Sequence, residues 1–466
     1  MTDRTCAVLV VGGGPGGYVA AIRTAQHGLD TVIVDAGPMG GTCLNVGCIP
    51  SKALIHVADE MAAVSNHAEL GRLGIRIGGD PTIDLAATVG WKDGVVGRLR
   101  TGVERLLDAA GATRITGRAV IVDGKTVRIE QADGSSLLVR AEHLVIATGS
   151  RPVELPHLPF GGPIISSTDA LALTEMPAEL VVVGAGYIGL ELGIAFRKFG
   201  ARVTVVEMAD RILPQYDSAL TAPVAKRLAG LDVPVLLRTL ATGWAAEDGA
   251  LVVGDHDGHE QRLPADRVLV TVGRTPVVTG FGLESLDLGM DGKFIRVDDR
   301  CRTSMRGVYA IGDVTGEPML AHRATAQGEL VADVIAGHRR AWDSVIPEVC
   351  FTDPEIVSVG MSPERAADAG VDVITETFPF AASGRALTLD RGDGFVRIVA
   401  RREDHLVVGA QAVGAGVAEL SGELVTAIEM GSTLEDVASI VHAHPTLAES
   451  IGEAAMKALG HGLHVR

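Results

Sequence analysis

Apolar and polar positions near the N-terminus follow the order strand, helix, strand. A β-branched run over Thr5–Val11 predicts a strand, Tyr18–His27 predicts a helix, and Thr31–Val34 predicts a second strand. Both strands are apolar at consecutive positions, which is typical of strands that are buried on both faces of a parallel sheet. The N-terminal segment is therefore predicted to be a unit of parallel strands joined by a helix.

The same order of elements returns in the middle of the chain. Leu180–Val183 predicts a strand, a helix follows up to Phe199, and Arg202–Val206 predicts the next strand. Between the two units, Ile55–Ala110 is largely helical in pattern, and short alternating strands follow over 117–147. The pattern thus predicts two similar α/β layers in one chain.

From about Pro347 the pattern changes, because strands and helices alternate without glycine-rich turns between them. We expect a separate α+β domain there, and subunit assembly is a natural use for it. The predicted fold class is α/β, with two Rossmann-like nucleotide-binding domains and a C-terminal α+β dimerisation domain. A chain of 466 residues is too long for a single core. The predicted domains, in chain order, are 1–149, 150–276, 277–346 and 347–466.

Glycines follow the first predicted strand at a spacing typical of dinucleotide binding. Gly12, Gly14 and Gly17 fit the pattern GxGxxG. In this pattern the first glycine permits the turn, the second lets a pyrophosphate approach the backbone, and the third lets the helix pack on the strand. Asp35 ends the second strand, where an acidic residue binds ribose hydroxyls. We call the three glycines the first fingerprint.

The second α/β layer carries its own fingerprint, Gly184, Gly186 and Gly189, with Glu207 at the end of the second strand. The acid follows the first glycine by 23 residues in both layers (35 − 12 and 207 − 184). A carboxylate at this place pairs with a free 2′-hydroxyl and repels a 2′-phosphate, so the second site is predicted to prefer NAD to NADP. The alternative is that a nearby arginine, at 202 or 211, accepts a phosphate.

Two cysteines with four residues between them follow the first nucleotide unit. Cys43 and Cys48 lie in GGTCLNVGCIPSK, and the segment from Cys48 onward is helical in pattern. A thiolate near a helix N-terminus is stabilised by the unpaired N–H groups there, which lowers its pKa. Lys52 adds a positive charge one turn along the same helix face. The segment is predicted to be a redox dithiol, against the alternative of two buried structural thiols.

An acid/base pair is predicted near the C-terminus, in HAHPTLAES. A helix begins after Pro445, so Glu449 on its first turn can reach back to His442 or His444. A carboxylate that holds an imidazole fixes its tautomer and raises its basicity. These histidines alone would be read as structural, but a dithiol elsewhere in the chain requires a base.

Composition excludes several classes of function. The formal charge of −17 argues against nucleic acid and anionic membrane surfaces as partners. Five cysteines in so long a chain do not form a secreted disulfide framework, and Cys6, Cys301 and Cys350 are predicted to be structural. No uncharged run is long enough to span a membrane, and no targeting signal or metal-ligand spacing is recognised. We expect a cytoplasmic protein without a metal ion.

Together these segments resemble the flavoprotein disulfide reductases of the pyridine nucleotide-disulfide oxidoreductase family. The resemblance covers essentially the whole chain, and GGTCLNVGCIPSK with HAHPTLAE is highly specific. ATGSRP, VGRTP and IGDV with MLAH fall in the family's order, at 147–152, 272–276, 311–314 and 319–322. The whole chain is thereby expected to adopt the family's fold.

The resemblance also implies roles for individual residues. FAD would be bound by the first fingerprint and by Asp35, Lys52, Gly117, Ala119, Asp313 and Ala321. NAD would be bound by the second fingerprint with Glu207 and Gly273. The catalytic residues would be Cys43, Cys48, Lys52 paired with Glu191, and His444 oriented by Glu449.

The activity that the resemblance implies is oxidation of a protein-bound dihydrolipoyl group. The substrate would attack the disulfide at Cys43, Cys48 would pass electrons to FAD, and FAD would give a hydride to NAD. His444 would reach in from the other subunit of a homodimer. The partner would be the lipoyl-bearing acyltransferase of a 2-oxoacid dehydrogenase complex, of which the branched-chain type is one form.

Two alternatives stay open at this point. The first is another FAD-dependent disulfide reductase, acting on glutathione, mycothiol or mercuric ion. Glu207 argues against those that prefer NADP, and the C-terminus lacks the paired cysteines of mercuric reductases. The second is a non-catalytic redox sensor, which would not require Lys52, His444 and Glu449 together with a dithiol.

Overall fold

A computed structural model describes residues 2–255 and 257–465. The chain folds into two compact units, each assembled from three separate segments. The first unit comprises the chain up to Glu154 with 166–176 and 272–343, and the second comprises 155–165, 177–271 and the chain from Ser344 onward. The predicted division into four domains is finer than this and stays a prediction.

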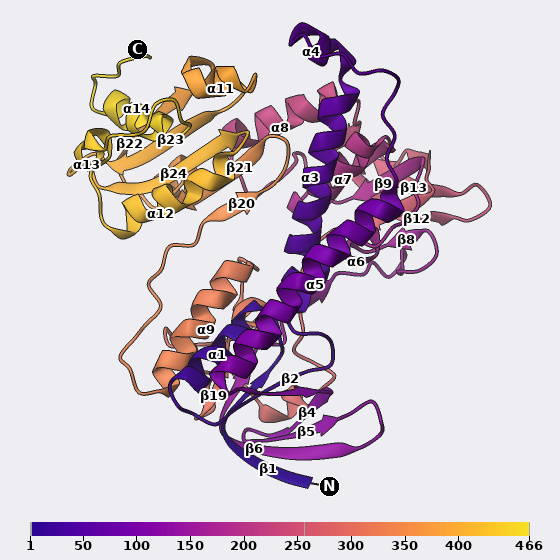
Figure 1. Cartoon of the computed structure of the whole chain (residues 1–466), viewed down its shortest axis with the longest axis vertical. Helices are drawn as coiled ribbons and strands as arrows, with labels where there is room; N and C mark the ends of the chain where they lie inside the picture. The colour runs from indigo at the N-terminus through magenta and orange to yellow at the C-terminus, as the bar shows by residue number, and fades with distance from the viewer. Residues whose placement is uncertain (1, 256, 466) are drawn as a thin grey trace. The chain divides into compact units, whose positions relative to one another are not determined.

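The first unit contains the first fingerprint and the two cysteines (Figure 1). Its elements are β1 (Thr2–Val11), α1 (Pro15–Gln26), β2 (Thr31–Asp35), α2 (Gly41–Val46), α3 (Cys48–Ser65), α4 (His67–Arg72), α5 (Leu85–Ala110), β3 (Thr113–Thr116), β4 (Arg118–Asp123), β5 (Thr126–Glu130), β6 (Ser136–Ile146), β7 (Ser150–Pro152), α6 (Ser167–Ala170), β16 (Arg274–Pro276), η1 (Leu283–Leu286), β17 (Met290–Asp291), β18 (Phe294–Ile295), β19 (Val308–Ala310), η2 (Gly312–Thr315) and α9 (Ala321–Ile335).

The main sheet of this unit has the strand order β3-β2-β1-β6-β5-β4, with β19 also paired to β6. The strands β1, β2, β3 and β19 run parallel to their neighbours, whereas β4 and β5 are antiparallel. In β6, the first half pairs with β5 and the full strand pairs with β1. A single long strand thus joins the parallel part of the sheet to the antiparallel part.

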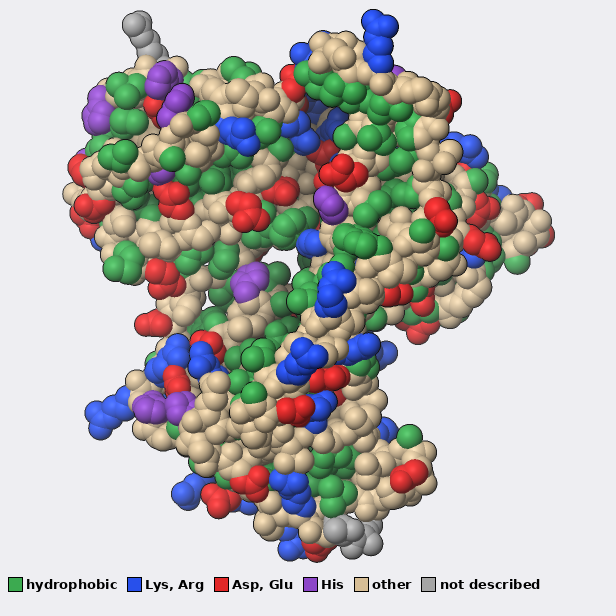
Figure 2. All heavy atoms as spheres, in the orientation of Figure 1, with side chains coloured by type: hydrophobic (Ala, Val, Ile, Leu, Met, Phe, Trp, Pro, Cys, Tyr) green, Lys and Arg blue, Asp and Glu red, His purple; other side chains and the backbone are tan. Residues whose placement is uncertain are grey.

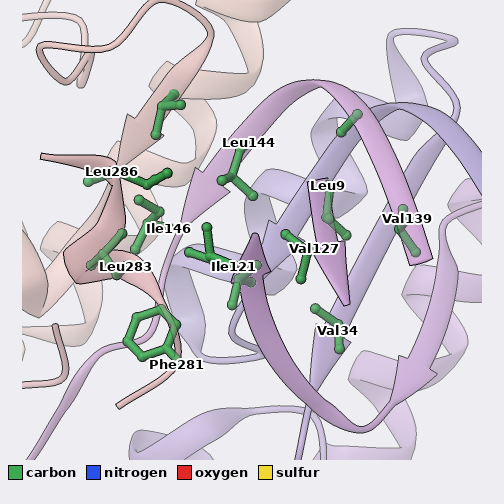
Figure 3. Packing of buried hydrophobic residues seen from close by; sticks show 14 of the residues in the cluster. Leu9, Val34, Ile121, Val127, Val139, Leu144, Ile146, Phe281, Leu283 and Leu286 are labelled. Atoms are coloured by element: carbon green, nitrogen blue, oxygen red, sulfur yellow. The ribbon is translucent and has the colours of Figure 1, made fainter. Parts of the chain in front are cut away.

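Alternate residues of the parallel strands enter two separate cores. Leu9 and Val11 of β1 lie on one face of the sheet, and Val8 and Val10 lie on the other. Successive side chains of a strand point to opposite faces of the sheet, and both faces are buried here. Consecutive residues of β1 are therefore all apolar. Figure 3 shows the first core, in which Phe281, Leu283 and Leu286 pack near residues from β1, β2, β4, β5 and β6.

Helices cover the second face of the sheet. Ala20 and Ala21 of α1, Leu107 of α5, and Leu330 and Val331 of α9 are buried in the core there. The small residues of α1 permit the close approach of α9, which lies beside it (Figure 1). The fingerprint helix is therefore held between the sheet and a second helix.

The second unit contains the second fingerprint and the C-terminal segment (Figure 1). Its elements are β8 (Ile164–Ile165), β9 (Glu179–Val183), α7 (Tyr187–Phe199), β10 (Arg202–Val206), α8 (Ser218–Gly230), β11 (Val235–Leu236), β12 (Thr239–Ala245), β13 (Ala250–Asp255), β14 (Glu260–Pro264), β15 (Arg267–Val270), β20 (Glu348–Cys350), β21 (Glu355–Gly360), α10 (Pro363–Asp368), β22 (Val373–Pro379), η3 (Phe380–Ala382), α11 (Gly384–Thr388), β23 (Phe395–Arg401), β24 (Val407–Gly414), η4 (Val417–Leu420), α12 (Ser421–Glu429), α13 (Leu434–Ser439) and α14 (Glu449–Ala458).

The second unit contains a parallel five-stranded sheet with the order β11-β10-β9-β15-β8. The strands β9 and β10 and the helix α7 between them correspond to the second predicted α/β layer. A three-stranded antiparallel sheet, β12-β13-β14, packs its buried side chains into the same core. This small sheet lies between the predicted strands and was not predicted from the sequence.

The C-terminal segment forms an antiparallel sheet with the order β20-β21-β24-β23-β22. Side chains of α12, α13 and α14 pack into the core of this sheet, which confirms the predicted α+β character of the segment. Its separation as a domain stays a prediction, because it belongs to the same compact unit as the second fingerprint. Across the part of the chain that the structure describes, no helix combines the length and the apolar character needed to cross a membrane.

Candidate active site and nucleotide-binding sites

Cys43 and Cys48 lie on two consecutive helices of the first unit. Cys43 is in the short helix α2, and Cys48 is the first residue of α3, with Gly47 between the helices. A Cβ at Gly47 would lie 2.8 Å from the carbonyl oxygen of Thr42, so the tight junction requires glycine. The two sulfurs are not bonded to each other in this structure, and Cys48 is the more exposed.

The thiols of Cys43 and Cys48 interact directly. Their hydrogen bond is the largest cause of a raised pKa for Cys43, and burial and the negative charge of a Cys48 thiolate raise it further. Lys52 acts in the opposite direction, because its ammonium group favours the thiolate. The pKa of Cys43 is raised overall, because a second thiol shares its proton. The lowering expected for the thiol at the helix N-terminus stays a prediction.

The segment before the dithiol is packed against the first fingerprint. The amide of Gly40 donates a hydrogen bond of 2.8 Å to the carbonyl of Gly13. A Cβ at Gly41 would lie 2.5 Å from the Cα of Gly14, so the two loops touch backbone to backbone. The nucleotide loop and the redox pair are consequently one continuous piece of structure.

The first fingerprint has the geometry that its spacing predicts. Gly12 has a φ of 110°, and a Cβ there would lie 2.2 Å from the carbonyl oxygen of Ala147. A Cβ at Gly17 would lie 1.8 Å from the carbonyl oxygen of Gly12, so α1 packs directly on the turn. At Gly14, by contrast, the only atom that a Cβ would meet within 4 Å is Gly41 Cα, at 4.0 Å. Open space therefore lies where a pyrophosphate must approach.

Asp35 closes this site at the end of β2. Its Oδ2 accepts a hydrogen bond of 2.6 Å from the amide of Gly13, and its Oδ1 accepts one of 2.7 Å from the amide of Gly37. An ionised carboxylate has further lone pairs, which remain for ribose hydroxyls.

Glu207 repeats this arrangement in the second unit. Its Oε2 accepts a hydrogen bond of 2.6 Å from the amide of Ala185, and its Oε1 accepts one of 2.7 Å from the amide of Ala209. Each acid thus bonds to the residue after the first glycine and to the residue two positions after itself. The matched spacing in sequence corresponds to a matched hydrogen-bond pattern.

The second fingerprint also repeats the packing of the first. A Cβ at Gly189 would lie 2.2 Å from the carbonyl oxygen of Gly184, whereas a Cβ at Gly186 would meet nothing within 4 Å. Both fingerprints therefore fit a dinucleotide by the same test: a close helix contact at the third glycine and open space at the second.

The two arginines near Glu207 have other partners. Nε of Arg202 donates a hydrogen bond of 2.7 Å to Glu179, and Arg211 donates one of 3.1 Å to the carbonyl of Pro214. Their engagement weakens the alternative that one of them accepts the phosphate of NADP.

Three of the family-like motifs meet in the first unit. Ser150 donates a hydrogen bond of 2.5 Å to Oδ2 of Asp313, and Nε of Arg274 donates one of 2.7 Å to the Ser150 hydroxyl. The strands β7 and β16, which carry Ser150 and Arg274, pair with each other. Asp313 lies inside η2 and is not its N-cap residue, so its role is not that of a capping aspartate.

Sequence reasoning missed Ser150, Arg274 and Gln327 as part of this region. The side chain of Gln327 accepts a hydrogen bond of 2.7 Å from the amide of Gly312, which fixes the loop that carries Asp313. The motifs ATGSRP and VGRTP contained Ser150 and Arg274, but no sequence signal showed that they pair. The glutamine lies mid-helix and has no local signal at all.

The remaining residues expected near FAD lie in the first unit. The amide of Gly117 donates a hydrogen bond of 2.9 Å to the carbonyl of Asp35, and Ala119 packs against the core beside it. Ala321 is the first residue of α9. Gly273, expected near NAD, has a φ of 131° and accepts a hydrogen bond from the amide of Val153.

Glu191 lies on α7, the helix that follows the second fingerprint, and it is buried. Its Oε1 accepts a hydrogen bond of 2.9 Å from the amide of Phe351. The expected ion pair between Glu191 and Lys52 would join residues of different units and stays a prediction.

His444 and Glu449 are paired as predicted. Nδ1 of His444 lies 2.8 Å from Oε1 of Glu449, and Oε2 accepts a hydrogen bond of 2.8 Å from the amide of Thr446. Burial acts to raise the pKa of Glu449, but the hydrogen bonds from Thr446 and His444 outweigh it, so the pKa is lowered. The carboxylate is thus ionised, and 79% of the His444 side chain is exposed to solvent. His442 has a different partner, Glu423, at 2.7 Å.

The three single cysteines are buried, as expected for structural thiols. Burial is the main cause that raises the pKa of Cys6 and of Cys301 to about 12, so neither is a reactive thiolate.

Two nucleotide-binding layers and a dithiol next to the first of them define a disulfide oxidoreductase that uses two nucleotide cofactors. The chain belongs to the pyridine nucleotide-disulphide oxidoreductase family: the model of this family matches residues 6–328, and that of its dimerisation domain matches residues 346–455. The cofactors are FAD and NAD, and the dimerisation domain supports a homodimer.

Similar proteins cover the full length of the chain. A dihydrolipoyl dehydrogenase from Pseudomonas aeruginosa is 56% identical over 98% of both chains. One from Geobacillus stearothermophilus is 46% identical over 98% of this chain and 97% of its own. Among solved structures, LpdA from Mycobacterium tuberculosis has a TM-score of 0.88 at 26% identity, over 98% of this chain and 99% of its own.

Proposed function

We propose that this chain oxidises protein-bound dihydrolipoyl groups to lipoyl groups through the Cys43–Cys48 pair and reduces NAD. The observation that carries the proposal is the direct interaction of these two thiols beside the first fingerprint. The full-length similarity to dihydrolipoyl dehydrogenases supports the choice of substrate. The charge and position of Glu207 support NAD as the acceptor.

The sulfur chemistry proceeds in two exchanges. A substrate thiolate attacks Sγ of Cys43 in the disulfide form, so that a mixed disulfide forms and the Cys43–Cys48 bond breaks. The second substrate thiolate then attacks the substrate sulfur of the mixed disulfide, which closes the lipoyl ring and releases Cys43. The substrate loses two electrons and two protons, and the protein gains a dithiol. FAD at the first fingerprint would supply the acceptor for this electron pair, and NAD at the second would supply the final hydride acceptor.

His444 is the base that accepts the protons of the substrate thiols. Because Glu449 engages Nδ1, the other ring nitrogen, Nε2, remains for the substrate. His444 acts in the site of the other protomer of the homodimer, so that each active site is shared between subunits. The high exposure of its side chain in a single chain supports this arrangement.

Lys52 has an electrostatic role beside the dithiol. Its ammonium group lowers the pKa of Cys43 against the effect of burial and of the second thiol. It thereby favours the thiolate that the exchange releases. Its proposed partner is the buried carboxylate of Glu191, which would hold the ammonium group in place.

The cofactors are assigned to the two fingerprints. FAD binds the first fingerprint with Asp35, and Lys52, Gly117, Ala119, Asp313 and Ala321 lie along it. NAD binds the second fingerprint with Glu207 and Gly273. The support is the fit described above, in which both second glycines leave space and both acids keep free lone pairs.

The protein partner is the lipoyl-bearing acyltransferase of a 2-oxoacid dehydrogenase complex, and the compartment is the cytoplasm. A dithiol that must cycle between two redox states suits a reducing compartment, where protein disulfides are transient and catalytic.

The test is steady-state reduction of NAD and of NADP by dihydrolipoamide with the purified FAD-bound protein. Reduction of glutathione disulfide by NADPH serves as the comparison. We expect turnover with dihydrolipoamide and NAD. Turnover only with glutathione disulfide and NADPH would assign the chain to another disulfide reductase, and the absence of both would favour a redox sensor.

A further inference from the structure

The helices α1 and α9 run side by side and in the same direction. A Cβ at Gly328 would lie 2.5 Å from the carbonyl oxygen of Gly16, near the start of α1. Further along, Nη2 of Arg23 lies 3.3 Å from Oε1 of Glu329. Residues early in α1 contact α9 before the residues later in α1 do, so the two helices are parallel. Their C-terminal ends therefore lie next to each other.

Three side chains with metal-ligating atoms meet at these ends: His27 after α1, Asp333 in the last turn of α9, and His338 after α9. Nε2 of His27 lies 2.9 Å from Oδ1 of Asp333, and the rings of His27 and His338 are 5.2 Å apart between centroids. One ligand atom from each residue lies within 4.8 Å of the other two. Histidine, acidic and arginine or lysine side chains gather on this face of the unit (Figure 2).

Asp333 is prepared to act as a ligand. Nη1 of Arg340 lies 2.6 Å from its Oδ2, so this oxygen is held while Oδ1 faces His27. Outer partners orient the ligands of metal sites in the same way, so the carboxylate already has a fixed orientation.

The ligand types in this group determine which metal ion it can bind. Two imidazoles and one carboxylate, with a position left for water, are the ligands of borderline divalent ions such as Zn²⁺. The C-terminal end of a helix carries partial negative charge, and here two such ends meet. Arg23 and Arg340 do not leave this region positive, because Glu329 and Asp333 pair with them.

We propose that His27, Asp333 and His338 form a binding site for a divalent transition-metal ion of the zinc type, which joins the C-terminal ends of α1 and α9. In a tetrahedral site with bonds of about 2 Å, the ligand atoms lie about 3.3 Å from one another. Nε2 of His27 and Oδ1 of Asp333, at 2.9 Å, must therefore separate slightly, and the ligand atom of His338, within 4.8 Å of both, must move closer. His27 and His338 are exposed residues at helix ends, so side-chain rotation supplies this movement. Metal binding replaces the proton between Nε2 of His27 and Oδ1 of Asp333.

The site is separate from the redox reaction. The twelve residues of α1 span about 18 Å, so the ion lies that far from the fingerprint end of the helix. Its effect is to fix the packing of two helices that both begin near the first nucleotide site. No local pattern in the sequence indicates this site, because His27 and Asp333 are 306 residues apart.

A second group of potential metal ligands in the described residues is a weaker candidate for a metal site. It consists of Asp255, Asp257 and His259. It lies in one hairpin loop, and Oδ1 of Asp255 already accepts hydrogen bonds from the amides of the other two residues. The side chain of His259 is 80% exposed.

The test is calorimetric titration of the FAD-bound protein with zinc chloride. The Cys43–Cys48 pair is kept in the disulfide form, because thiolates bind zinc. His338→Gln removes one ligand and leaves the His27–Asp333 pair intact, and His27→Gln removes another. His405→Gln is the matched control, since His405 is also paired with a carboxylate, at 2.6 Å from Glu435.

We expect the parent protein to bind one zinc ion that His338→Gln and His27→Gln each weaken by at least about tenfold, with no change in His405→Gln. Zinc should raise the melting temperature of the parent and of the control more than that of either ligand variant. Equal isotherms for the parent and both ligand variants would overturn the proposal, as would a parent that binds no zinc. Neither result depends on the identity of the redox substrate.

Discussion

His444 and Glu449 are joined by a hydrogen bond between Nδ1 and Oε1, and the same carboxylate accepts the amide of Thr446 through its other oxygen. The carboxylate therefore fixes both the imidazole and the turn that presents it. Replacing His444 with Gln should lower kcat for dihydrolipoamide oxidation by about 10²- to 10⁴-fold, with FAD content and the dimer retained. Steady-state kinetics and gel filtration check this, with His405→Gln as a control that keeps activity. A near-normal rate in His444→Gln would remove this residue from the mechanism.

Glu449 is a positioning residue for the same base. Glu449→Gln should lower kcat by about tenfold, because the imidazole loses the carboxylate that fixes its orientation. A purely structural role would change the melting temperature and leave kcat of the folded protein as it was.

The hydrogen bond between the thiols has a measurable consequence for Cys43. In Cys48→Ala the largest cause that raises the pKa of Cys43 is gone, so Cys43 should react with iodoacetamide at a lower pH than in the reduced parent. Peptide mass spectrometry follows the labelling of Cys43 alone. Cys301, whose pKa burial raises to about 12, should stay unlabelled in both proteins. An unchanged pH dependence would mean that burial, and not Cys48, controls this thiol.

Glu207 should control the choice between NAD and NADP. In Glu207→Gln the repulsion of a 2′-phosphate is lost, and the ratio of kcat/KM for NAD to that for NADP should fall by about tenfold to a hundredfold. Glu179→Gln, which frees Arg202 from its partner, is the informative control. If that control increases the use of NADP, Arg202 takes part in recognition.

Substitution by alanine should have different effects on NAD binding and on stability at two glycines of the second fingerprint. Gly186→Ala places a methyl group in the open space, so KM for NAD should rise by about tenfold while stability is unchanged. Gly189→Ala places it 2.2 Å from a carbonyl oxygen and should cost about 1–3 kcal/mol of unfolding free energy. Equal effects on KM and stability in both variants would contradict these separate roles.

Asp353 should give the second unit a stability that depends on pH. Burial acts to raise its pKa, but Lys198, Arg391 and Arg227 outweigh it, and the pKa is lowered below its ordinary value of 3.8. The stabilisation is therefore complete above 3.8 and is lost as the pH falls below it. At pH 7, Asp353→Asn should cost about 3–5 kcal/mol of unfolding free energy.

Urea unfolding at several pH values measures this contribution. The difference between parent and Asp353→Asn should shrink as the pH falls below 3.8. Asp372→Asn is the matched control, because Asp372 is paired with Arg402 at the surface, where an ion pair contributes about 0–1 kcal/mol. A difference that is constant with pH would assign the effect to packing.

The parts of the site that could be predicted from sequence are those built by neighbouring residues. Fingerprint glycines, the acid 23 positions later and the pair His444–Glu449 depend on local turns and helix starts, which residue type and spacing encode. The contact of Ser150 with Arg274 and Asp313 could not be predicted, because it joins segments that lie more than a hundred residues apart.

The small sheet β12-β13-β14 shows the same limit for the fold. Its strands form an antiparallel sheet with local connections, but one side packs on the parallel sheet of the second unit, and that packing partner cannot be read from the strands themselves. Likewise, the raised pKa of Cys43 depends on the mutual orientation of two thiols, which the spacing of the cysteines does not determine.

Gly40 and Gly41 contact the backbone of Gly13 and Gly14, so the glycine turn and the segment that leads to Cys43 cannot move independently. A substitution that displaces the turn also displaces this segment. A loss of flavin binding through such a substitution should therefore be accompanied by a change in the reactivity of the sulfur pair.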